Sequence, residues 1–266
     1  MIRDITIGQY YPVDSPIHRL DPRVKLIGTF LYIISVFLFD SFWGFLAVGA
    51  FLLGVIKLSK VPIKYIVKGL KAVVMLLLFT VAFNMFLTPG ETLWSWAFLK
   101  ITKEGLERSI FMGLRLIFLI LGSSLMTFTT TPNNLTDGLE KILGPLKVIK
   151  VPVHEIAMMM SIALRFIPIL LDETDKIMKA QQARGADFET GNLIQRAKSL
   201  IPILVPLFVS AFRRANDLAM AMEARCYRGG EGRTKMKPLK YEGKDFVAYG
   251  GIALYLAVII VIRVAI

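Results

Sequence analysis

Two short segments carry the same arginine-containing phrase, and they hold the residues whose type and spacing could mediate specific recognition. The phrase reads AQQARG at 180–185 and AMEARC at 221–226. A shift of 41 residues aligns three positions: Ala180 with Ala221, Ala183 with Ala224, and Arg184 with Arg225. Guanidinium groups can form paired hydrogen bonds to carboxylates or carbonyls, so each phrase is a candidate docking point.

The residues alone support two interpretations of this repeat. In the first, the arginines only complement the negative end of the helix dipole, and Gly185 takes the left-handed position after a helix. In the second, alanines one turn apart beside the arginine leave a narrow helix tip that can enter a groove on a partner. Two tips would then require two grooves, and hence a dimeric or pseudo-dimeric partner.

Other patterns argue against catalysis or metal binding by this chain. There is no phosphate-binding loop of the G-x-x-x-x-G-K-[ST] type, and the only histidines, His18 and His154, lie far apart. A single cysteine, Cys226, excludes an internal disulfide and offers no metal-ligand spacing. A cluster of three acidic residues is better explained as a solvated helix face than as a metal site: Asp172, Glu173 and Asp175. We therefore expect no catalytic residues, no metal and no cofactor.

The composition indicates an integral membrane protein. Of 266 residues, 55% are hydrophobic, and the mean hydropathy is +0.60. Soluble domains are typically about 45–50% apolar. The net charge of +12 fits basic cytoplasmic loops better than nucleic-acid binding. The start of the chain lacks the pattern of a removable signal peptide.

Five apolar runs predict an all-α polytopic fold with about five membrane spans: 26–39, 42–56, 72–87, 109–130 and 246–262. The first two have about fifteen residues each, fewer than the ~20 needed to span, so we expect a short hairpin flanked by snorkelling lysines. Arg115 lies inside the fourth run, and we expect it to snorkel toward the outer surface. The tryptophans Trp94 and Trp96 suit the outer interface.

Basic residues predict the orientation of the spans. Arg19, Arg23 and Lys25 precede the first run, and the loop 57–71 carries five lysines and no acid. By the positive-inside rule, these segments and the basic insert 131–242 are cytoplasmic, and the C-terminus is outside.

Four regions follow from this topology. We expect a cytoplasmic N-terminal segment (1–25), a transmembrane domain of about four helices (26–130), a cytoplasmic domain of long helices (131–242) and a C-terminal transmembrane helix (243–266). Within the third region, caps and stops predict helices over 132–143, 153–184 and 192–228. We expect the second to be kinked at Pro168 and the third to be interrupted at Pro202 and Pro206.

The chain resembles the transmembrane T components (EcfT) of energy-coupling factor transporters, the ABC-type importers of vitamins and metal ions. The resemblance covers essentially the whole chain and rests on five segments: YYPVDSPIHRLDPRVKL (10–26), TTTPNNLTDGLEKILGPL (129–146), MMMSIALRFIPIL (158–170), AQQARGADF (180–188) and RANDLAMAMEARCYRGG (214–230). It implies that Arg184 and Arg225 each dock into one of two ATPase subunits. Four neighbours complete the two motifs: Ala183, Gly185, Ala224 and Cys226. In the family the second motif often ends in Gly or Ser, so Cys226 is a departure.

The resemblance also suggests a contact with a substrate-binding S component. A methionine-rich run and two leucines of the next long helix are candidates: Met158, Met159, Met160, Leu204 and Leu207. Such residues more often fill a core, yet flexible thioethers also suit surfaces that adapt to several partners.

The expected function is that of a non-catalytic coupling subunit in a bacterial or archaeal cell membrane. It would transmit ATP-driven motion of two ATPase subunits to the S component, without binding nucleic acid. Because the vitamin or ion would be bound by another chain, this sequence does not identify it. A conventional ABC permease that lines the substrate path is one alternative, and a membrane enzyme is another.

Overall fold

The computed structural model describes residues 10–71, 73–96, 99–186, 188, 192–230, 236 and 238–265. Side chains are not described at 68, 92–101, 193, 196 and 197. The chain forms two compact units, which we call the bundle unit (Gly8–Ile142 with Leu239–Ile266) and the long-helix unit (within Leu143–Pro238).

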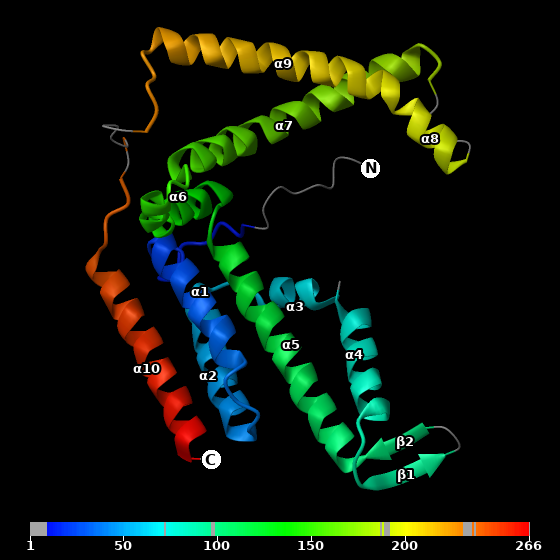
Figure 1. The fold of residues 1–266 in the computed structure, drawn as a ribbon, viewed down its shortest axis with the longest axis vertical. Helices are drawn as coiled ribbons and strands as arrows, with labels where there is room; N and C mark the ends of the chain where they lie inside the picture. Colours follow the sequence, from blue (N-terminus) through cyan, green and yellow to red (C-terminus); the bar gives the residue numbers. More distant parts are fainter. Residues whose placement is uncertain are drawn as a thin grey trace. The chain divides into compact units, whose positions relative to one another are not determined.

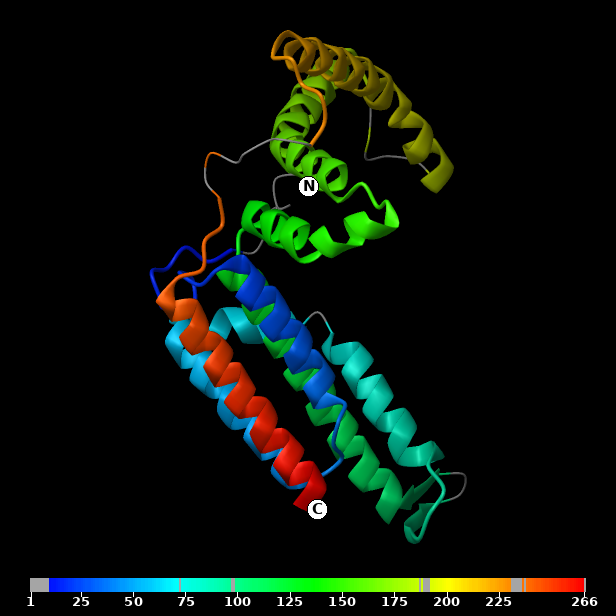
Figure 2. The same ribbon diagram turned by 60° about the vertical axis from the view of Figure 1, so that its left-hand side comes forward.

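The bundle unit consists of seven described helices and a short hairpin (Figures 1 and 2): α1 Pro22–Val36, α2 Phe42–Ser59, α3 Ile63–Lys71, α4 Val74–Leu87, β1 Thr92–Trp96, β2 Leu99–Thr102, α5 Lys103–Thr129, α6 Pro132–Ile142 and α10 Gly243–Ala265. The long helix α5 packs against α1, α2, α3 and α4, whereas α10 packs against α1 and α2. The first and last helices of the chain therefore lie side by side.

Local sequence explains where these helices begin. The Asp21 carboxylate accepts from the Arg23 backbone N–H at 2.8 Å, and Pro22 occupies the first turn of α1. Ser41 and Thr102 cap α2 and α5 by accepting from the N–H groups of Gly44 and Gly105. Polar side chains thus start three of the apolar helices.

Aromatic and aliphatic side chains form the core where α1, α2, α5 and α10 meet. Phe51 and Tyr255 stack with their ring centroids 4.1 Å apart. The Tyr255 and Ser35 hydroxyls, both buried, share a 2.6 Å hydrogen bond. A polar pair therefore links α1 to α10 inside an otherwise apolar core.

The all-α polytopic fold is confirmed, but the helices that could span a membrane are not all those expected. Among the described residues, α2, α5, α10 and α7 (Val153–Ala183) are long and apolar enough, and the bent pair α3–α4 adds a fifth if it is one broken span. The region predicted to be the first span corresponds to helix α1, which has 15 residues, fewer than the ~20 needed to cross the membrane. Helix α7 qualifies because its first half is apolar, although its second half is charged.

The loop expected at 88–104 contains an antiparallel hairpin, in which Thr92 pairs with Thr102 and Trp96 with Leu99. This short hairpin is an addition to the helical fold. The Trp94 and Trp96 side chains, expected at the outer interface, lie outside the described residues.

Arg115 was expected to snorkel toward the outer surface; it reaches the exposed carboxylate of Asp40 in the loop after α1, but the arginine side chain itself is mostly covered. Its side chain is only 14% exposed and donates to the Val36 carbonyl (3.2 Å), the Phe39 carbonyl (2.8 Å) and the Asp40 carboxylate (2.6 Å). The guanidinium therefore satisfies backbone carbonyls at and just beyond the C-terminal end of α1, which a helix leaves without intrahelical donors.

The long-helix unit contains the 3-10 helix η2 Gly144–Ile149 and helices α7 Val153–Ala183, α8 Leu193–Ser199 and α9 Ile201–Ala224. The helix expected over 192–228, with interruptions at Pro202 and Pro206, is interrupted only near the first of these prolines, since Pro206 lies inside α9. It breaks at Leu200, directly before the proline-containing first turn of α9. It also ends at Ala224 rather than at Gly229, because Cys226 adopts a left-handed conformation (φ 54°).

Candidate functional site

The end of α7 is a tight cap built around Arg184. The Arg184 N–H donates to the Gln181 carbonyl (3.0 Å), and the Gly185 N–H donates to the Gln182 carbonyl (2.9 Å). Gly185 has φ 89°, and the next N–H, that of Ala186, returns to the Gln181 carbonyl at 3.0 Å. This left-handed residue followed by a returning bond is the Schellman arrangement.

The end of α9 repeats this cap bond for bond, 41 residues later. Arg225 donates to the Met222 carbonyl (3.2 Å), Cys226 to the Glu223 carbonyl (2.8 Å) and Tyr227 to the Met222 carbonyl (3.0 Å). Cys226 takes the place of Gly185 with φ 54°. The sequence repeat is therefore also a backbone repeat.

Both arginines are presented to the surroundings. Arg184, Arg225 and the alanines that precede them, Ala183 and Ala224, are exposed. Within the described part of the chain, neither guanidinium has a hydrogen bond or an ion pair. The Cys226 thiol is free and exposed. Five of the six predicted docking positions thus form two bare helix tips, and Gly185 provides the turn of the first.

The two tips lie at opposite ends of a pair of antiparallel helices (Figure 1). The Gln181 side chain near the end of α7 donates to the carbonyl of Pro202 at the start of α9 (3.4 Å). Arg225 follows 23 residues after Pro202. At 1.5 Å of rise per residue, α9 therefore separates the two tips by roughly 35 Å.

An ion pair joins the two helices between their ends. Arg214 of α9 donates to the Glu173 carboxylate of α7 at 2.9 Å. Glu173 was expected on a solvated face, yet its side chain is only 23% exposed because α9 covers it. Among the described residues, no three His, Cys, Asp or Glu side chains gather as metal ligands would.

The predicted hydrophobic contact residues divide into two groups. Met159 (57%), Met160 (41%) and Leu204 (46%) are largely exposed, whereas Met158 and Leu207 are half-buried. The exposed residues therefore extend over both α7 and α9.

The exposed apolar side chains of α9 form a continuous stripe, of which the sequence interpretation had named only Leu204 as a contact residue. We call it the α9 stripe: Ile201, Leu204, Val205, Phe208, Val209 and Phe212. The spacing i, i+3, i+4, i+7, i+8, i+11 places them on one helix face, and this periodicity was the signal that could have identified all six.

Comparisons with known proteins agree with this architecture. The CbiQ family, described as cobalt transport protein, matches residues 14–236. A Clostridium kluyveri protein named energy-coupling factor transporter transmembrane protein EcfT is 60% identical over 250 residues, which cover 93% of each chain. Proteins of the same name are 55% identical in Ruminiclostridium cellulolyticum (99% of this chain, 98% of the relative) and 51% identical in Bacillus subtilis (92% and 93%). The chain therefore belongs to the CbiQ family, among the transmembrane components of energy-coupling factor transporters.

Proposed function

We propose that this chain is a non-catalytic coupling subunit whose two helix tips each bind one ATPase subunit of the transporter. The observation that carries the proposal is the duplicated cap, with an exposed, unpaired arginine at the end of α7 and another at the end of α9. Helix capping alone does not require an exposed arginine at the same position in both copies. Binding to two identical grooves does require the same arginine in each copy, because each groove must contact the same side chain.

The antiparallel packing of α7 and α9 supports transmission of force between the tips. The Glu173–Arg214 ion pair and the Gln181–Pro202 contact hold the two helices together. When ATP binding draws two ATPase subunits together, the tips that they hold must move with them. Because the helices are linked, they move as one element and do not bend independently.

The α9 stripe supplies the second contact that a coupling subunit needs. Phe208 and Phe212, in the middle and toward the far end of the stripe, are 62% and 68% exposed. Contiguous exposed apolar residues of this kind mark sites that bind a protein or a membrane. We assign the stripe, with Met159 and Met160, to the S component that binds the vitamin or metal ion. In this arrangement, the N-terminal segment and 131–242 face the cytoplasm of a bacterial or archaeal cell.

The test reverses the charge of the two arginines at the helix tips. Arg184→Glu combined with Arg225→Glu should abolish co-purification of the ATPase subunits and ATP-driven uptake, because carboxylates repel the acceptors that bind a guanidinium. The matched control is Arg213→Glu, which makes the same charge change at an exposed arginine of α9 away from the tips. Normal uptake in the double variant would refute the proposal.

A conservative variant separates docking from capping. Arg184→Lys keeps the positive charge that complements the helix end, but it loses the planar fork needed for two parallel hydrogen bonds. Docking predicts weakened ATPase binding with an unchanged melting temperature. A lysine variant that binds ATPase normally would favour capping as the only role of Arg184.

A further inference from the structure

The bundle unit contains an apolar cavity of about 530 Å³ between α1, α2, α5 and α10. Its volume lies within the range of about 300–1,000 Å³ that is common for small-molecule sites. Two wall hydroxyls are already occupied, since Tyr32 donates to the Phe118 carbonyl (2.9 Å) and Thr129 to the Leu125 carbonyl (2.9 Å). Thr29 adds a third hydroxyl, and the other lining side chains apart from two lysines are apolar, so a molecule inside the cavity meets a mostly apolar wall.

The cavity opens sideways, toward the surface of the helices. Leu58 of α2 and Val247 of α10 line it and are 54% and 76% exposed. Gly251 also lines it, and no atom lies within 4 Å of the position that a Cβ there would take. In a membrane protein, such an opening is accessible to lipid acyl chains.

Lys25 places a positive charge at one end of this cavity. Its half-buried ammonium donates to the His18 carbonyl (3.0 Å) and the Thr129 carbonyl (2.8 Å). No carboxylate within the described residues lies close enough to form an ion pair with it. A cation removed from water is normally paired with an anion. The Lys25 ammonium can therefore bind an anionic group of another molecule.

The neighbouring carboxylates are engaged elsewhere. Asp21 pairs with Arg23 at 2.8 Å, and Asp245 accepts from the Asp21 and Glu242 backbone N–H groups, both at 2.8 Å. They lower the positive potential at the cavity without contacting the Lys25 ammonium.

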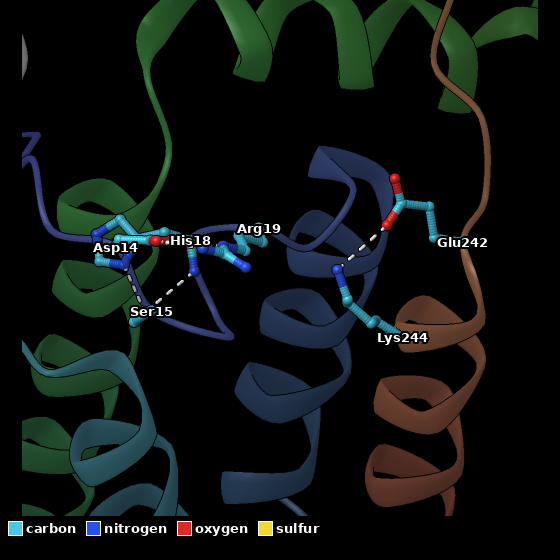
Figure 3. A network of polar contacts seen from close by, with 6 residues as sticks. All are labelled: Asp14, Ser15, His18, Arg19, Glu242 and Lys244. Atoms are coloured by element: carbon cyan, nitrogen blue, oxygen red, sulfur yellow. Dashed lines mark hydrogen bonds and ion pairs between the residues drawn. The ribbon is translucent and has the colours of Figure 1, made fainter.

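A second lysine lies at the same end of the cavity. Lys244 of α10 lines the cavity, is 59% exposed, and approaches Glu242 only at 3.5 Å (Figure 3). Arg19, on the same side of the bundle, is already paired with Asp14 (Figure 3). The two cavity lysines therefore supply the available positive charge.

We propose that this cavity binds an anionic phospholipid, with one acyl chain between the helices and the phosphate beside Lys25 and Lys244. The apolar wall and the sideways opening fit a chain that enters from the bilayer. Basic pockets between membrane helices bind anionic lipid headgroups. This inference is independent of the two helix tips, so it can fail while the proposed function stands.

The test measures retained lipid by native mass spectrometry of the full-length protein in detergent. Phosphatidylglycerol and phosphatidylcholine with identical acyl chains are added separately, and the protein should retain phosphatidylglycerol preferentially. Gly251→Leu fills the cavity and should lower this retention at least about tenfold, the effect of losing about two buried methylenes. The matched control is Gly250→Leu, at an equally open position that does not line the cavity. It should retain lipid as the unmodified protein does.

A second variant keeps the test independent of how well Gly251→Leu folds. Lys244→Glu alters an exposed side chain and should lower phosphatidylglycerol retention about fivefold or more while leaving phosphatidylcholine unchanged. Equal retention of the two lipids by the unmodified protein would overturn the proposal. Unchanged retention in both variants, or preferential retention of oleate over phosphatidylglycerol, would overturn it as well.

Discussion

Replacing Arg115 with methionine should destabilise the bundle unit far more than neutralising its acidic partner. The guanidinium donates to the carbonyls of Val36 and Phe39, and both residues are at most 5% exposed. Hydrogen bonds from a charged group contribute about 1.5–3 kcal/mol each, so losing two costs about 3 kcal/mol or more. The Asp40 carboxylate is 81% exposed, which limits that ion pair to about 1 kcal/mol or less.

The assay is thermal unfolding of the purified protein in detergent. A loss of about 3 kcal/mol corresponds to a melting temperature lower by roughly 6–12 °C for a chain of this size, whereas Asp40→Asn should lower it by about 4 °C at most. Arg108→Met is the matched control, because it removes an exposed arginine from the same helix. If Asp40→Asn destabilised the protein as much as Arg115→Met, the carbonyl bonds would not be the main contribution and the reasoning would be refuted.

Three further predictions concern the cap, the N-terminal segment and the core. Cys226→Gly should raise the melting temperature by about 2–4 °C, because a non-glycine residue in the left-handed region costs about 1 kcal/mol; an unchanged or lower value would contradict this. Burial lowers the pKa of His18 and outweighs the hydrogen bond to the Tyr11 carbonyl (3.0 Å), which favours the charged ring, so the folded state favours the neutral imidazole. Melting temperatures measured from about pH 8 to about pH 5 should therefore fall as the pH drops below about 6.5, the unfolded value, and level off below the folded pKa, with a flatter profile in His18→Asn. Tyr255→Phe should cost about 0.5–1.5 kcal/mol, because the buried Ser35 hydroxyl loses the Tyr255 bond but keeps its bond to the Tyr32 carbonyl (2.7 Å). In a double-variant cycle, Tyr255→Phe should cost less when Ser35 is already alanine.

Local sequence signals predicted the bounds of α6 and α7 to within one residue, because those ends depend on neighbouring residues. Gly185, for example, indicated the end of α7. The end of α9 was missed because cysteine rarely adopts the left-handed conformation that Cys226 takes (φ 54°). The alignment of Cys226 with Gly185 in the sequence repeat could have predicted the correct end of α9.

Contacts between distant residues could not be predicted in the same way. Arg115 and Val36 are 79 positions apart, and only the packing of α5 against α1 brings them together. Glu173 looked solvated because its partner Arg214 lies on another helix. The residues of the two helix tips were predicted from sequence, whereas their antiparallel placement depended on the contact between Gln181 and Pro202.

Photo-crosslinking in the assembled transporter can show whether each helix tip contacts an ATPase subunit. A photoreactive amino acid is placed at Ala183 in one variant and at Ala224 in another, so that each probe sits beside one arginine without removing it. We expect both positions to form covalent adducts with an ATPase subunit, and the same probe at Arg213 to form none. If neither tip formed an adduct in a transporter that still takes up its substrate, the tips would not be the docking points for the ATPase subunits.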